Sequence, residues 1–175
     1  MVDRETYPSN QPKDYTMKTA IIALFLAALA TPALASGSHE GGHEKAMAIG
    51  EPGDKAKVTQ TIRVTMKETD DGKMLFTPSK FEFKKGKTVR FTVKNVGELD
   101  HEFILDEQKS NLEHKAVMEK FPEMEHDNPN AISLASGETG EIIWKFTNDG
   151  LFEFACLKPG HYEAGMRGDL TVSAK

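Results

Sequence analysis

The chain has 175 residues, of which 28% are charged, and its formal net charge is −5. This mildly acidic balance argues against nucleic acid as a partner, because nucleic-acid binding relies on clustered basic residues. The single cysteine excludes an internal disulfide, so the fold is not a disulfide-stapled scaffold.

Residues 17–35 have the layout of a secretory signal peptide. Lys18 gives a positive start, residues 20–30 are an uninterrupted apolar run, and small residues end at Ala35. The run is shorter than the roughly 18 apolar residues of a membrane anchor. We therefore predict export to the periplasm, cleavage after Ala35 and no membrane span in the mature protein. The polar residues 1–16 fit no signal-peptide region and are predicted to be an extension upstream of the native start.

Residues 36–56 are rich in glycine and charge and show no apolar periodicity. This composition predicts a flexible leader. Its side chains His39, His43 and Met47 are candidates for weak copper binding. The alternative interpretation is a flexible polar tail that binds no metal.

From residue 57 to 175 the pattern changes to short runs of alternating apolar and polar residues. This alternation predicts half-buried strands, bounded by turn signals such as Asp71-Gly72. The predicted strands are 58–66, 80–86, 88–97, 101–105, 140–147, 151–156 and 169–174. We therefore predict one all-β domain, a Greek-key β-sandwich or barrel of about seven or eight strands.

One segment, about 107–130, interrupts the strands and is predicted to carry an inserted helix. The expected helix has Ser110 or Asn111 as its N-cap and ends at Pro122. Its predicted apolar side consists of Leu112, Ala116, Val117 and Phe121.

The same insertion contains two histidines and two methionines that offer a second hypothesis. His114 and Met118 are four residues apart and share a helix face, and Met124 and His126 follow. Thioethers and imidazoles suit Cu(I) or Ag(I), so one interpretation is an extra metal site. The other interpretation is that the methionines pack in the protein interior.

Cys156 ends the strand 151–156, where alternation places it on the same face as Phe152 and Phe154. In an exported protein, a lone thiol is buried and inert, paired with another molecule, or bound to a ligand. The following loop contains a proline and two glycines, so it can fold back and bring His161 and Met166 near the sulfur.

His101, at the start of another predicted strand, is the best candidate for a fourth ligand. Two imidazoles, one thiolate and one thioether form the ligand set of a blue-copper site. Zinc is the rival metal, but methionine is a poor zinc ligand. Each of these four residues, taken alone, could have an ordinary structural role, so the hypothesis of a metal site depends on their joint spacing.

The stretches "NVGELDHEF" and "FEFACLKPGHYEAGM" resemble the cupredoxin family over about residues 58–175. They are most similar to periplasmic plastocyanin/azurin-like proteins linked to copper tolerance, and the Cys-x4-His-x4-Met spacing resembles rusticyanin. The resemblance implies one type 1 copper that alternates between Cu(I) and Cu(II). It also implies that His101, Cys156 and His161 are equatorial ligands and that Met166 is the axial ligand.

Two functions follow as hypotheses. The first is a periplasmic blue copper protein acting in electron transfer, copper tolerance or both, with electrons entering through the edge of His161. The second is a copper or silver sequestration or delivery protein that uses the additional histidines and methionines. A copper enzyme is not expected, because it needs a further open metal position with clustered histidines, and the chain has six histidines and no His-x-His pair. We expect a monomer whose partner is a redox protein or a copper-handling protein.

Overall fold

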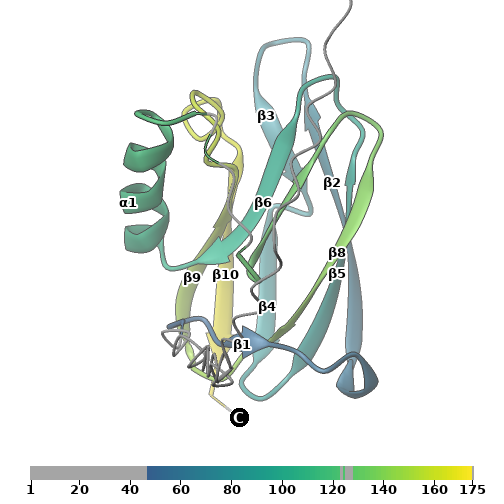
Figure 1. Ribbon diagram of the computed structural model, residues 1–175. Coiled ribbons are helices and arrows are strands. Elements are labelled where there is room, and N and C mark those ends of the chain that lie inside the picture. Colours follow the sequence, from purple (N-terminus) through teal and green to yellow (C-terminus); the bar gives the residue numbers. More distant parts are fainter. Residues whose placement is uncertain (1–46, 123, 125–127, 175) are drawn as a thin grey trace, which may run out of the picture. The chain divides into compact units, whose positions relative to one another are not determined.

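The computed structural model describes residues 47–122, 124 and 128–174. Two five-stranded sheets pack against each other, which confirms the predicted all-β sandwich (Figure 1). The first sheet has the order β1 (Glu51–Pro52), β8 (Thr139–Lys145), β5 (Thr88–Asn95), β2 (Gln60–Glu68) and β3 (Met74–Thr77). The second has the order β4 (Lys80–Lys84), β10 (Arg167–Ser173), β9 (Gly150–Ala155), β6 (His101–Asp106) and β7 (Ala131–Leu134).

Pairing within the sheets is mixed. β2 is parallel to β5 and β4 is parallel to β10, whereas the other pairs are antiparallel. In the second sheet, the antiparallel pairing of β6 with β9 puts the first residue of β6 at the same end as the last residue of β9. Chain segments more than 50 residues apart in sequence therefore meet at one end of the sandwich.

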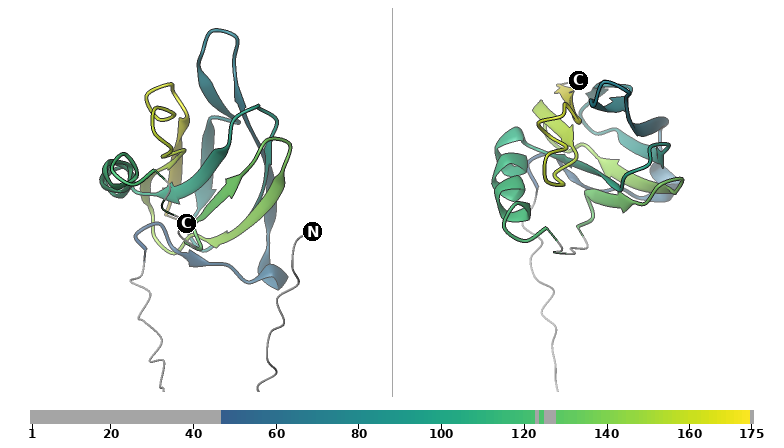
Figure 2. Two further views of the ribbon diagram at one scale, coloured as in Figure 1. Left: turned by 45° about the horizontal axis from the view of Figure 1, so that its top comes forward. Right: turned by 90° about the horizontal axis from the view of Figure 1, so that it is seen from above.

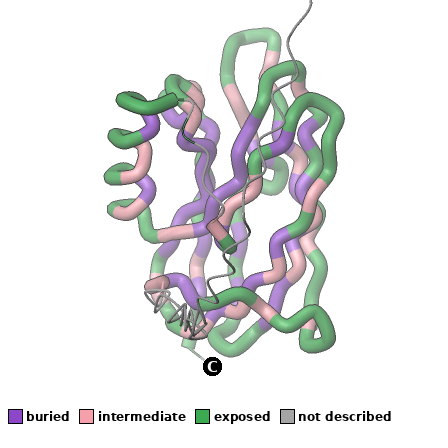
Figure 3. Tube along the Cα trace, in the orientation of Figure 1, coloured by how far each residue is buried: buried purple, intermediate pink, exposed green. Residues whose placement is uncertain are grey.

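The core lies between the sheets and is built from the apolar residues that the alternation pattern places on their inner faces (Figure 3). Phenylalanines dominate it, and their rings meet in stacked and edge-to-face pairs. The largest fully buried side chains include Trp144, Phe91, Phe103, Phe146 and Phe154. Cys156 and Met166 belong to the same cluster, so the site described below rests directly on the core.

Three strands were absent from the sequence prediction, namely β1, β3 and β7. Each is four residues or shorter, so each offers too few residues to show alternation. β1 also corrects the predicted extent of the leader. Ile49 is completely buried and accepts a hydrogen bond on its carbonyl from the indole of Trp144, so the chain is part of the fold before residue 57. A one-turn 3-10 helix, η1 (Lys55–Lys57), follows β1.

The inserted helix, α1 (Gln108–Met118), is present, but its ends and its buried side differ from the prediction. It begins before the expected caps Ser110 and Asn111 and ends before Pro122. The residues buried on it are Asn111 and Met118, whereas the predicted apolar residues Leu112, Val117 and Phe121 are 45%, 40% and 60% exposed.

A polar group beneath the helix accounts for the burial of Asn111. α1 packs on the outer side of β9 (Figures 1 and 2), and there Asn111 donates a hydrogen bond from Nδ2 to Oε1 of Glu153 over 3.1 Å. A buried carboxylate needs polar partners, so Asn111 faces β9, and Met118 is the other buried residue of the helix. Among the described residues, no helix is both long enough and apolar enough to cross a membrane.

Candidate metal centre

The loop between β9 and β10 carries three of the four predicted ligands and is closed by backbone hydrogen bonds. The amide of Cys156 donates to the carbonyl of Met166, and the amide of Met166 donates to the carbonyl of His161, both over 3.0 Å. Gly160 and Gly165 have φ angles of +84° and +102°, a region that glycine enters without a Cβ penalty. The compact turn therefore brings residues five apart in sequence next to one another.

Cys156 follows the last residue of β9 and is completely buried. Its Sγ accepts a hydrogen bond from the backbone N–H of Glu102 over 3.3 Å. Burial raises the pKa of the thiol to about 12, although that N–H and the N–H of Lys158 act in the opposite direction. In the metal-free protein at neutral pH the group is therefore a thiol, and a metal that binds the thiolate displaces one proton.

His101, Cys156 and His161 form one cluster of ligand atoms. Nδ1 of His101 lies 3.1 Å from Nδ1 of His161, and that nitrogen lies 3.4 Å from Sγ of Cys156. All three atoms are within 4.8 Å of one another. Within the part of the chain that the structure describes, this is the one group of three or more His, Cys, Asp or Glu side chains with such spacing.

The spacing suits a single ion. Two nitrogens bound about 2.0 Å from a tetrahedral metal are about 3.3 Å apart, and a nitrogen and a sulfur at about 2.3 Å are about 3.5 Å apart. The observed separations of 3.1 and 3.4 Å are close to both values. The donor set, two imidazoles and one thiol, is also one that copper accepts.

Met166, the predicted axial ligand, precedes β10 and is completely buried in the same core cluster as Cys156. Its backbone is hydrogen-bonded to both Cys156 and His161. The structure therefore places the methionine beside the cluster, and its role as a ligand remains a prediction.

The two histidines are prepared to act as neutral ligands. Burial lowers the pKa of His101, with Glu68 acting in the opposite direction, and burial together with the neighbouring His101 lowers the pKa of His161. Both imidazoles are therefore uncharged at neutral pH, which leaves a lone pair on each for a metal.

We expect the metal-free protein to lose stability as the pH falls from 7 to 5. Because both histidines have folded-state pKa values below the ordinary 6.5, the unfolded state binds more protons as the pH drops through that value. Urea unfolding at pH 7, 6 and 5 measures the change. The control is the double variant His101→Gln/His161→Gln, whose free energy of unfolding should depend less on pH in this range. Equal pH dependence in both proteins would contradict the prediction.

Several residues that support the loop were not singled out from the sequence. Glu153 on β9 accepts hydrogen bonds from Asn111 of α1 and from the hydroxyl of Tyr162 in the loop, over 3.1 and 2.9 Å. Lys115 of α1 also forms a 2.7 Å ion pair with Glu163 of the loop. The inserted helix thus holds the loop in place from its outer side. The one sequence signal was a glutamate within the strand "LFEFAC", on the face opposite to Phe152, Phe154 and Cys156.

Glu68, the last residue of β2, is the second unpredicted neighbour. Its Oε1 lies 2.8 Å from Nε2 of His101, on the opposite side of the ring from the cluster. Burial would raise the pKa of this carboxyl, but the backbone N–H groups of Leu99 and Glu98 and the nearby His101 lower it to about 2. The side chain is therefore an anion at every physiological pH.

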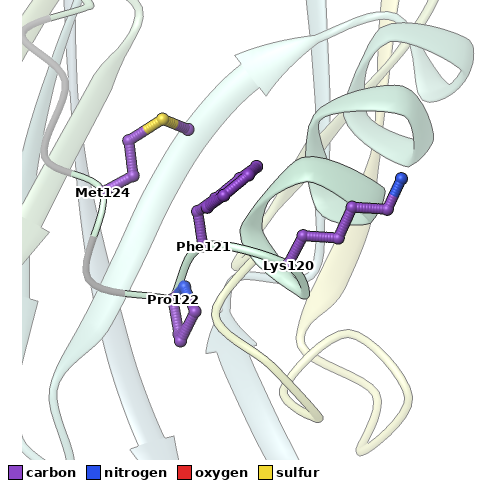
Figure 4. Close-up of a pocket in the computed structure, with 4 residues that line it drawn as sticks. All are labelled: Lys120, Phe121, Pro122 and Met124. Atoms are coloured by element: carbon purple, nitrogen blue, oxygen red, sulfur yellow. The ribbon is translucent and has the colours of Figure 1, made fainter.

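The residues proposed for additional metal binding differ in their surroundings. Met118 is buried, and Met47 packs against the main core, as expected for structural methionines. Met124 is 39% exposed and lines an open, largely apolar pocket with Lys120, Phe121 and Pro122 (Figure 4). His114 lies on α1, half-buried. His39, His43 and His126 lie outside the described residues.

Comparisons with known proteins agree with this geometry. Residues 62–173 match the family model "Copper binding proteins, plastocyanin/azurin family". The chain is 40% identical over 168 residues to the copper-resistant cuproprotein CopI of Rubrivivax gelatinosus, covering 91% of this chain and 99% of that protein. It is 34% identical to the copper-resistant cuproprotein CopI of Pseudomonas aeruginosa, covering 71% and 82%. In fold it is similar to the dithionite-reduced auracyanin of Roseiflexus castenholzii, with a TM-score of 0.54, 23% identity and coverage of 66% and 98%.

Proposed function

The chain belongs to the plastocyanin/azurin family of copper binding proteins, and from this we propose that it holds one type 1 copper ion between His101, Cys156, His161 and Met166. The observation that carries the proposal is the cluster of two imidazole nitrogens and one sulfur at separations suited to a single ion. When bound, copper supplies a one-electron couple between Cu(I) and Cu(II). The ligand set serves both states, because thiolate and thioether favour Cu(I) and imidazoles accept either.

The protein's contribution is to keep the ligands in place. Cys156 and Met166 are part of the aromatic core, and the loop between them is closed by its own hydrogen bonds and held by α1. A rigid frame of this kind limits the rearrangement that accompanies a change of oxidation state, which suits an electron carrier. The N–H of Glu102, directed at Sγ of Cys156, stabilises the thiolate.

We propose that electrons pass through His161. This ring is partly exposed, whereas His101, Cys156 and Met166 are completely buried. Among the proposed ligands, His161 is therefore the side chain that a redox partner can approach most closely.

The biological setting we propose is copper tolerance in the periplasm, with a redox protein or a copper-handling protein as the partner. The names of the relatives, copper-resistant cuproproteins, support a role in tolerance and a binding function in place of an enzymatic one. The signal-peptide pattern of residues 17–35 supports export.

The decisive experiment is an optical and EPR spectrum of the copper-loaded protein together with its metal content. We expect one copper per chain and an intense visible band from thiolate-to-copper charge transfer. A copper content above one would favour the alternative, sequestration at additional histidines and methionines. A single copper with no thiolate band would contradict the proposed site.

Replacing Met166 with Leu should retain copper and raise the reduction potential. Leucine fills a similar volume but offers no sulfur, and loss of a weak axial ligand favours Cu(I), because the potential of such sites depends on the axial ligand. Voltammetry and metal analysis of the variant measure both effects. Loss of copper from this variant would show that the axial assignment is wrong.

A further inference from the structure

The carboxylate of Glu68 connects the two sheets beside the metal centre. Glu68 ends β2 in the first sheet, and His101 begins β6 in the second. Oε1 of Glu68 lies 2.8 Å from Nε2 of His101. His101 is completely buried, and the Glu68 side chain is only 21% exposed, so the contact is largely shielded from water.

This contact decides which nitrogen of His101 carries the proton. Both oxygens of Glu68 accept backbone N–H groups, and a carboxylate oxygen is an acceptor, so Nε2 of His101 is the donor in this contact. Nδ1 is then left with its lone pair, and Nδ1 is the atom that faces His161 at 3.1 Å. The ring is thus held in the tautomer and orientation in which Nδ1 can act as a ligand.

Glu68 is itself held from the other side by the loop that precedes His101. Its two carboxylate oxygens accept hydrogen bonds from the backbone N–H groups of Leu99 and Glu98, over 2.9 and 3.0 Å. Gly97 leaves the room for this arrangement, because a Cβ at that position would collide with the Glu68 carboxylate. The Glu68 carboxylate is therefore held by three N–H donors, namely the backbone amides of Glu98 and Leu99 and Nε2 of His101.

We propose that Glu68 is a positioning residue of the metal centre: it fixes the His101 imidazole with Nδ1 free and makes that nitrogen a stronger donor to Cu(II). This inference rests on the proposed function, because it takes copper as the ion. A carboxylate bound to the far nitrogen of a ligating histidine increases the basicity of the ligand and orients its ring. Its negative charge also favours the more highly charged metal ion.

Four variants of the full-length chain separate the parts of this proposal. Glu68→Gln keeps an acceptor oxygen and removes the charge, and Glu68→Ala removes both. Gly97→Ala keeps the charge and pushes the carboxylate away from its N–H donors. Asp100→Asn is the matched control, because Asp100 is an exposed acid next to His101 whose charge also acts on that ring.

The first readout is the tautomer of His101 in the metal-free protein, measured by long-range proton–nitrogen NMR correlations. The wild-type and Asp100→Asn proteins should show the proton on Nε2. Glu68→Ala and Gly97→Ala should show nitrogen shifts averaged between the two tautomers. An unchanged tautomer in both variants would overturn the proposal.

The second readout is the ratio of Cu(II) to Cu(I) affinity, from chelator competition and voltammetry. Glu68→Gln should lower this ratio about tenfold, equivalent to a rise of about 59 mV in reduction potential. Glu68→Ala and Gly97→Ala should lose about 10- to 100-fold in Cu(II) affinity, and Asp100→Asn should change either quantity less than about threefold. If Glu68→Gln and Asp100→Asn changed the reduction potential equally, the effect would come from the loss of any nearby negative charge and not from the contact with His101. That result would overturn the proposal. A wild-type chain that binds no copper would instead overturn the proposed function, and the NMR result would still decide the role of Glu68.

Discussion

Replacing Cys156 with Ser is expected to abolish the visible thiolate-to-copper absorption. The sulfur is the one soft donor in the cluster, and it becomes anionic when a bound metal displaces its proton. It lies 3.4 Å from Nδ1 of His161 and accepts a hydrogen bond from the backbone N–H of Glu102. A hydroxyl is a hard donor that stays protonated, so we expect Cu(I) affinity to fall by more than about 100-fold, which exceeds the effect of losing a residue that only orients a ligand. Absorption spectra and chelator competition measure the two effects.

The variant has a matched control within the insertion. The triple substitution His114→Gln, Met118→Leu, Met124→Leu removes the histidine and methionines of the described insertion and leaves the proposed ligands intact. It should retain the band and a content of one copper. A band that persists in Cys156→Ser would contradict the site, and a drop in copper content in the triple variant would favour the sequestration hypothesis.

Phe154→Ala should destabilise the metal-free protein by about 3–5 kcal/mol. Phe154 is completely buried, and its ring centroid lies 4.4 Å from that of Phe81 and 5.3 Å from that of Phe76. Truncation removes these contacts and leaves a cavity between the sheets. Urea unfolding monitored by circular dichroism gives the free energy.

Leu151→Ala on the same strand is the matched control. Leu151 is 82% exposed, so its truncation should change the free energy of unfolding by no more than about 0.5 kcal/mol. Similar losses in the two variants would show that strand propensity, and not core packing, determines the stability of β9.

The fold was largely predictable because most strands display their burial in the sequence. Alternation identified seven strands, and Phe152, Phe154 and Cys156 lie in the main core as the pattern predicted. Very short strands do not show a period, so β1, β3 and β7 were missed. The predicted leader extends too far along the chain, because Ile49 is held by a contact with Trp144, almost 100 residues away, which the local sequence does not show.

Candidate ligands could be identified in the sequence where they share a loop, and were harder to identify where they do not. The spacing of Cys156, His161 and Met166 is visible in eleven consecutive residues, and His101 was found as a histidine at a strand end. Nothing in the sequence marks Glu68, which is 33 residues from His101 and resembles any other charged residue at the end of a strand. Partners from another sheet become visible only when the two sheets are placed together.

The predicted buried side of α1 was wrong for a related reason. An amphipathic pattern predicts the buried side of a helix only if the surface beneath it is apolar. Here Glu153 and Tyr162 offer polar groups, so Asn111 is buried and Leu112 is exposed.

The helix inserted between β6 and β7 is connected to the ligand loop by a continuous set of contacts. Asn111 of α1 and Tyr162 of the loop both donate hydrogen bonds to the Glu153 carboxylate, and Lys115 of α1 pairs with Glu163 of the loop. Apolar burial adds to these polar contacts, because Met118 of α1 is buried and Tyr162 belongs to a second buried cluster with Ile104, Ala155 and Leu157. Mutational drift in the insertion is therefore constrained by the metal centre, although none of the four proposed ligands lies in it.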